Sequence, residues 1–155
     1  MYIGILTAPL RSKPLSEIIP WAASIGVKAL EVDVSPGSAF DATAVDDATV
    51  QQTLELLRQH DVRISSLAAY GLLTGVPEQR AAQARATLEA AIPLAARMGV
   101  DVVCTLAGFP AQGKNRLQTI REDLPGALGP VLDLAGQHGI RIALENWFAT
   151  NIQHL

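Results

Sequence analysis

The sequence predicts an α/β fold, a parallel sheet that forms the N-terminal half of a (β/α)8 barrel. Four segments repeat one pattern, in which a helix-ending residue is followed by Val or Ile, a charged residue and an apolar run; they are residues 26–32, 61–67, 99–105 and 139–145. A stretch with helical periodicity precedes each of them. Strands that alternate with helices in this way form parallel sheets with right-handed crossovers.

The strands follow from the start of the chain and from the repeat. Residues 2–6 (YIGIL) predict the first strand, because no basic segment of a signal peptide precedes them. In three of the four repeats the helix-ending residue is Gly, which closes helices in the left-handed conformation. A short run rich in β-forming residues after such a Gly is typical of a buried strand in a parallel sheet. The expected order is therefore β-α-β-α-β-α-β-α-β.

Apolar residues at helical spacing predict the four intervening helices, around residues 15–23, 50–57, 77–98 and 124–138. Pro20 and Pro93 fall inside two of these patterns. Each proline removes a backbone donor, so a kink or a late helix start is expected there.

Two architectures fit this order, an open doubly wound sheet and the first part of a closed barrel. Only residues 146–155 follow the fifth strand, too few for the helix that usually covers the end of a doubly wound domain. At ~38 residues per unit, eight units need about 300 residues. We therefore expect residues 1–155 to be a single domain, the front half of a longer barrel in a truncated chain. Its open apolar edges predict a homo-oligomer.

Composition excludes several classes of function. Twelve Lys and Arg against fifteen Asp and Glu give a net charge of −3 with no basic run, which argues against nucleic-acid binding. No apolar run approaches the roughly 18 residues of a membrane span. The single cysteine, Cys104, excludes disulfides and suits a reducing, cytoplasmic location. It is expected to be a small core residue, since nothing nearby in sequence would lower its pKa.

Reactive groups of parallel α/β folds gather at the carboxyl ends of the strands. Glu145 stands out there, because a carboxylate after an apolar strand costs free energy unless a metal, a cation or hydrogen bonds compensate it. A structural salt bridge is the alternative. Glu31 and Asp33 lie two apart and so share a face, either as functional groups or as a helix-cap partner and a solvated acid. The other candidates are Thr7, Tyr70, Thr105, Asn146 and Trp147.

Four segments together resemble the sugar phosphate isomerase/epimerase group of xylose isomerase-like barrels, the superfamily that also contains apurinic endonucleases. They are residues 3–7 (IGILT), 21–32 (WAASIGVKALEV), 64–71 (ISSLAAYG) and 142–146 (IALEN). The resemblance spans the whole chain and implies a metal-dependent enzyme of carbohydrate metabolism. In that group the glutamate that ends the fifth strand is one of four ligands of a divalent metal, here Glu145.

The resemblance implies proton transfer next to the carbonyl of a sugar or sugar phosphate through an enediolate, with Mn²⁺, Mg²⁺, Co²⁺ or Zn²⁺ as cofactor. Glu145 would be both metal ligand and catalytic acid/base, and the other three ligands would lie beyond Leu155, so the chain alone is expected to lack a complete active site. Substrate contacts would come from Thr7, Glu31, Tyr70, Thr105, Asn146 and Trp147.

Other functions stay open. A lyase, dehydratase or hydrolase could use the same barrel and metal, and a flavodoxin-like binding module is a non-enzymatic alternative. The latter needs an acidic cluster after strand one and a lysine after strand five, where this chain has Leu6-Thr7-Ala8-Pro9 and Glu145-Asn146. The absence of a Gly-x-Gly-x-x-Gly or Walker pattern argues against a nucleotide site.

Overall fold

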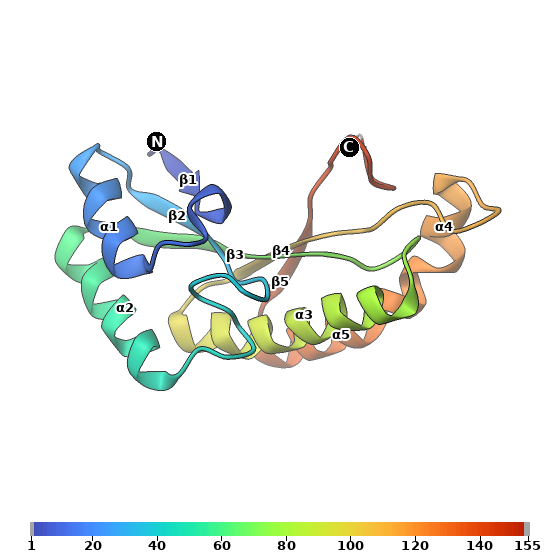
Figure 1. Ribbon diagram of the computed structural model, residues 1–155. Coiled ribbons are helices and arrows are strands. Elements are labelled where there is room, and N and C mark those ends of the chain that lie inside the picture. Colours follow the sequence, from blue (N-terminus) through green and yellow to red (C-terminus); the bar gives the residue numbers. More distant parts are fainter. Residues whose placement is uncertain (1, 154–155) are drawn as a thin grey trace.

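Five parallel strands form one sheet in the computed structural model, which describes residues 2–153 (Figure 1). The strands follow the sheet in chain order, and each pairs in parallel with the next. This is the α/β half-barrel topology that the repeat predicts. The strands are β1 (Gly4–Leu6), β2 (Ala29–Asp33), β3 (Arg63–Leu72), β4 (Val102–Leu106) and β5 (Arg141–Leu144).

The helices lie along one side of the sheet, and the opposite face is open (Figure 1). They are α1 (Leu15–Ser24), α2 (Asp47–His60), α3 (Glu78–Met98), α4 (Arg116–Glu122) and α5 (Leu124–His138), with a short 3-10 turn, η1, at Ala8–Leu10. The core lies between sheet and helices, where Leu30, Leu67 and Val103 meet Leu88 and Val131, all fully buried. Alternate residues of each strand therefore face this core or the open side.

The repeat ends the helices as its pattern predicts. Gly99 and Gly139 follow α3 and α5 with φ of 67° and 69°, in the left-handed region that Gly adopts without a steric penalty. Asp61 ends α2 in the same left-handed conformation, with φ of 51°. The chain then enters the next strand within two or three residues, so these strands begin at the same edge of the sheet.

Two expectations about the elements need correction, and one helix was missed. The first strand is shorter than residues 2–6, since only Gly4–Leu6 pair with β2. α1 and α3 run through Pro20 and Pro93, so the late helix starts are wrong. The buried apolar faces of both helices stabilise them despite the lost donors. α4 was not predicted, and it begins with a capping box between Asn115 and Gln118. No helix within residues 2–153 is long and apolar enough to cross a membrane.

Candidate functional site

A cavity of about 510 Å³ lies on the open face of the sheet and takes side chains from all five strands or the residues that follow them. Its polar wall brings together Glu31, Tyr70 and Glu145, three residues that sequence reasoning named, with Ser65 and Cys104. The rest of the wall is apolar and comes from β1 and β5. Two carboxylates thus share one partly apolar chamber.

Glu31 is a half-buried carboxylate surrounded by donors. Ser66 Oγ donates to its Oε2 at 2.8 Å, Tyr70 donates its phenol proton to Oε1, and Cys104 Sγ lies 3.7 Å from Oε2. A register shift between β2 and β3 sets Ser66, rather than Ser65, opposite Glu31. These hydrogen bonds compensate the burial of the negative charge. The bulge that orients Ser66 has no signal in the sequence, so Ser66 was missed.

Tyr70 stands between the two acids. Burial, then its hydrogen bond to Glu31 and the charge of Glu31, and then Glu145 raise the pKa of the Tyr70 phenol well above its usual range. The phenol is therefore protonated at neutral pH. It can donate a hydrogen bond, but it cannot act as a base.

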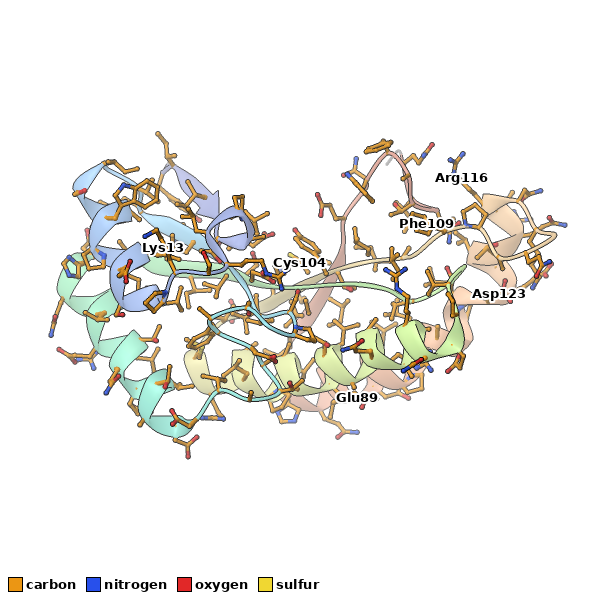
Figure 2. The ribbon with its side chains drawn as sticks, viewed as in Figure 1. Lys13, Glu89, Cys104, Phe109, Arg116 and Asp123 are labelled. Carbon is orange, nitrogen blue, oxygen red and sulfur yellow. The ribbon has the colours of Figure 1, made fainter. Side chains whose placement is uncertain are left out.

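Cys104 is not the small core residue that the sequence predicts. Its side chain is half-buried and lines the cavity on the open face (Figure 2). Its neighbours Val103 and Thr105 are the strand residues that turn to the helices, where both are fully buried. Burial and the negative charge of Glu31 raise the pKa of the Cys104 thiol to about 11, although a hydrogen bond with Ser66 opposes the rise. The thiol is therefore protonated at neutral pH and is not an activated nucleophile.

Glu145 is exposed and immediately follows β5. Its backbone N–H donates to Thr105 O at 2.9 Å, which continues the pairing of β4 with β5 by one residue. This hydrogen bond fixes the backbone from which the Glu145 side chain extends. No Lys, Arg or His within residues 2–153 forms an ion pair with its carboxylate. The described part of the chain therefore offers no structural salt bridge as an explanation for this acid.

Asn151 anchors the segment after β5. Its side-chain amide donates to Thr74 Oγ1 and to Phe109 O, both at 2.9 Å, and its backbone N–H donates to Gly108 O at 2.8 Å. The loops after β3 and β4 thereby hold the chain that carries Trp147. A polar residue in an irregular segment shows no periodicity, so sequence reasoning missed this buried asparagine.

Thr7 and Thr105, both proposed from sequence as substrate contacts, do not line the cavity. Thr7 Oγ1 accepts from Asp33 N at 2.8 Å and its own N–H donates to Glu31 O at 2.9 Å, so this buried residue joins the ends of β1 and β2. Asp33 is also buried, and it accepts from Ser35 N at 3.0 Å. Asn146 is exposed beside Glu145 and makes no hydrogen bond through its side chain within the described residues.

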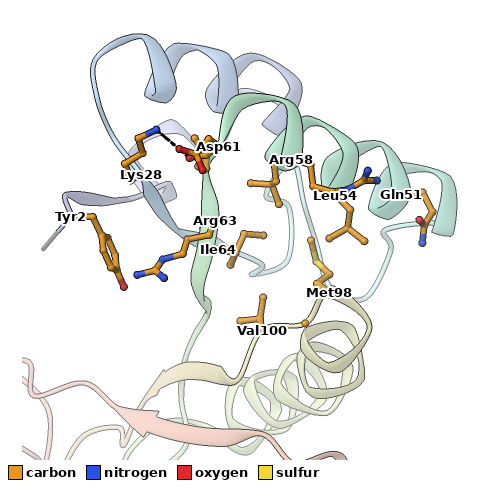
Figure 3. Close-up of a pocket in the computed structure, with 13 residues that line it drawn as sticks. Tyr2, Lys28, Gln51, Leu54, Arg58, Asp61, Arg63, Ile64, Met98 and Val100 are labelled. Atoms are coloured by element: carbon orange, nitrogen blue, oxygen red, sulfur yellow. Dashed lines mark hydrogen bonds and ion pairs between the residues drawn. The ribbon is translucent and has the colours of Figure 1, made fainter.

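A larger cavity, of about 850 Å³, lies at the amino ends of the strands between α2 and α3 (Figure 3). Its charged groups are already engaged. Lys28 Nζ lies 2.6 Å from Asp61, and the guanidinium of Arg63 lies 3.6 Å from the centre of the Tyr2 ring. The amino ends of barrel strands serve stability rather than catalysis. This cavity therefore does not compete with the site at Glu145.

A divalent metal would find one suitable ligand here. The Glu145 carboxylate is an oxygen donor of the kind that Mg²⁺ and Mn²⁺ prefer, and Zn²⁺ accepts it. Within residues 2–153, however, no three His, Cys, Asp or Glu side chains come close enough together to hold a metal ion. These residues fit one part of a metal site and do not complete one.

Residues 19–155 match the family model described as the xylose isomerase-like TIM barrel. The chain belongs to this family. No curated protein matches it.

Solved structures share the fold. The probable 3-DHS dehydratase AsbF of Bacillus anthracis is 17% identical with a TM-score of 0.74, over 97% of this chain and 54% of that one. The IOLI protein with a bound zinc atom is 15% identical with a TM-score of 0.73, over 98% and 54%. A D-psicose 3-epimerase is 15% identical with a TM-score of 0.71, over 97% and 54%. The chain spans about half the length of these three structures.

Proposed function

We propose that the chain supplies the first carboxylate of a divalent-metal-dependent sugar or sugar phosphate isomerase or epimerase. The observation that carries this proposal is the position of Glu145. Its carboxylate lies at the carboxyl end of β5, without a basic partner in residues 2–153, and lines the same cavity as Glu31 and Tyr70. Barrel enzymes build their active sites at this end of the strands.

Glu145 removes the proton from the carbon next to the substrate carbonyl. Return of the proton to the neighbouring carbon isomerises the sugar, and delivery to the opposite face of the same carbon epimerises it. Glu31 cannot replace Glu145 in this step, because its oxygens already accept from Ser66 and Tyr70. Its part is to hold the protonated Tyr70 phenol in the wall of the cavity.

When bound, a divalent ion would polarise the substrate carbonyl and make the neighbouring C–H more acidic. Glu145 would be one of its ligands, and the others would come from outside residues 2–153. The likeness in fold to a zinc-bound and to a magnesium-bound structure supports the use of a divalent ion.

Dehydration is the second candidate. It begins with the same proton removal by Glu145 and ends with loss of the hydroxyl group on the next carbon. The likeness in fold to the probable dehydratase of Bacillus anthracis favours it. The two reactions differ in whether the product has lost water, which a mass measurement decides.

The test is exchange of carbon-bound hydrogen with solvent, measured on the protein as its gene encodes it. Keto sugars and their phosphates are incubated in D₂O with Mn²⁺, and deuterium uptake is followed by NMR and mass spectrometry. Glu145→Gln should abolish uptake while the far-UV circular dichroism stays unchanged, because an amide cannot take the proton. Glu89→Gln is the matched control, since Glu89 lies exposed on α3, on the helix side of the sheet (Figure 2). Near-normal uptake by Glu145→Gln would refute the assignment.

We also propose a homo-oligomer in a reducing cytoplasm. β1 and β5 are the edges of the sheet, and Ile3 and Tyr2 beside β1 are 70% and 52% exposed. Unpaired edges with apolar side chains recruit other strands, and a twofold axis would let two copies cover each other. Light scattering combined with hydrogen exchange tests this. A monomer at ~100 micromolar, with β1 and β5 amides as protected as those of β3, would exclude it.

A further inference from the structure

A third cavity, of about 560 Å³, adjoins the cavity of Glu31 and Glu145 at the carboxyl ends of the strands, and Tyr70 lines both. Two arginines from separate elements belong to its wall, Arg11 after η1 and Arg80 in the first turn of α3. Trp147, two residues after Glu145, lines it as well. No Asp or Glu is part of this wall among the described residues. We call this cavity the arginine pocket.

Arg80 is unusual among the arginines of its helix. Arg85 and Arg97 of α3 each form an ion pair, with Glu78 and Asp47 respectively. No carboxylate of residues 2–153 lies within ion-pair distance of Arg80. Arg80 is exposed, and its N–H donors are open to a group that enters the pocket.

Arg11 is held at the other side of the pocket. Its Nη2 donates to Pro36 O at 3.0 Å, and its Nε lies 3.9 Å from the buried Asp33 carboxylate. These contacts fix the guanidinium and leave several of its N–H groups unused. Two positive charges thus face one cavity in a chain whose net charge is −3.

Resting on the proposed function, we infer that the arginine pocket binds an oxyanion of the substrate, a carboxylate or a phosphate. Guanidinium groups match both through paired N–H donors. The carbon skeleton would then lie along Tyr70 and Trp147, with its carbonyl end toward Glu145. The shared wall at Tyr70 makes the two cavities parts of one elongated site. A neutral sugar would leave both arginines without a partner.

The test measures binding to the metal-free 155-residue chain, so it needs no turnover. Inorganic phosphate, D-gluconate and the uncharged D-glucitol are titrated separately while the indole N–H of Trp147 is followed by NMR. Trp21, on α1 and outside the pocket, is the internal reference. Saturable shifts of the Trp147 signal are expected with phosphate, with D-gluconate or with both, and that difference identifies the oxyanion. D-glucitol should cause none.

Arg80→Gln should weaken this binding at least tenfold, and Arg80→Lys, which keeps a charge without the fork of donors, should weaken it less. Arg11→Gln should also weaken it. Arg141→Gln is the matched control, because Arg141 is exposed at the amino end of β5. Circular dichroism verifies that each variant is folded. Absence of saturation, equal binding of D-glucitol, or an equal loss in Arg141→Gln would overturn the inference.

The experiment separates this inference from the proposed function. Glu145→Gln should lose hydrogen exchange and keep its affinity for the oxyanion, since Glu145 does not line the arginine pocket. Arg80→Gln in the protein as its gene encodes it should instead raise KM for an anionic substrate and retain exchange at saturation. Failure of oxyanion binding with exchange intact would overturn only the pocket. Failure of exchange with binding intact would overturn only the reaction.

Discussion

The acid cluster on the open face can be tested through the titration of Cys104, the only cysteine of the chain. Burial and Glu31 raise the pKa of its thiol from 9.0 to about 11. At pH 8 the thiolate fraction is then about a hundredth of that of an ordinary thiol, because the pKa is about two units higher. Only the thiolate reacts, so the rate falls with this fraction. The more basic thiolate is roughly 6–10 times more nucleophilic, so the net rate should be about tenfold lower.

The assay follows the reaction of Cys104 with a small aromatic disulfide from pH 7 to pH 10. The logarithm of the rate should rise with unit slope up to pH 10, because the plateau belongs near pH 11. Glu31→Gln should bring the bend to lower pH, since it removes the negative charge that opposes the thiolate. Burial remains in that variant, so its midpoint should stay above 9.0.

Two further variants sharpen this test. Ser66→Ala should raise the pKa of the thiol further and so lower the rate at each pH between 7 and 10, because the Ser66 hydrogen bond lowers that pKa. Glu89→Gln on α3 should leave the profile unchanged. A plateau already at pH 9.5 in the wild-type chain, or equal profiles for the wild type and Glu31→Gln, would refute the geometry of Cys104 facing Glu31.

Three other predictions concern the metal and the packing. Calorimetry of the 155-residue chain with Mn²⁺ should detect weak binding or none, because Glu145 is a single ligand; a sub-micromolar site lost in Glu145→Gln but kept in Glu31→Gln would contradict this. Gly108→Ala should destabilise the chain by at least about 2 kcal/mol in urea unfolding, since the left-handed backbone disfavours a side chain. A Cβ there would also lie 2.4 Å from Thr74 N, and an unchanged unfolding midpoint would disprove that close approach. Leu88→Ala should cost about 2–5 kcal/mol, because it leaves a cavity in the core; a loss below 1 kcal/mol would show that α3 can close it. Leu88 is fully buried in the structure.

The strand order and the helix ends were predictable because they depend on local chemistry. Gly99 and Gly139 end their helices through backbone conformation alone, and the apolar run after each can only be a buried strand. α4 was not predicted because its seven residues are too few to show helical periodicity, and the polar residues of its capping box are equally common in loops. Short strands such as β1 and β5 could be predicted because they begin the chain or follow the repeated helix end, whereas α4 belongs to no repeat.

The site was predictable only in part. Glu145, Glu31 and Tyr70 could be found, because in a parallel sheet the end of every strand lies at one edge. Which side of a strand a residue faces depends on register, and the shift between β2 and β3 cannot be read from composition. That shift conceals Ser66. Cys104 was expected in the core because β4 is mostly apolar, whereas the alternation along β4 turns Cys104 to the cavity and Thr105 to the helices.

The same alternation explains why the acids cluster where they do. On the helix side of β2, Leu30 and Val32 are fully buried, so a charge there would have no solvent and no partner. On the open side the Glu31 carboxylate accepts hydrogen bonds from donors on β3 and β4. Two carboxylates in one chamber favour the approach of a cation, as the proposed metal site requires, and disfavour an anion. If the arginine pocket binds the oxyanion that we infer, the negative group of a substrate would bind there, in a wall without Asp or Glu among the described residues.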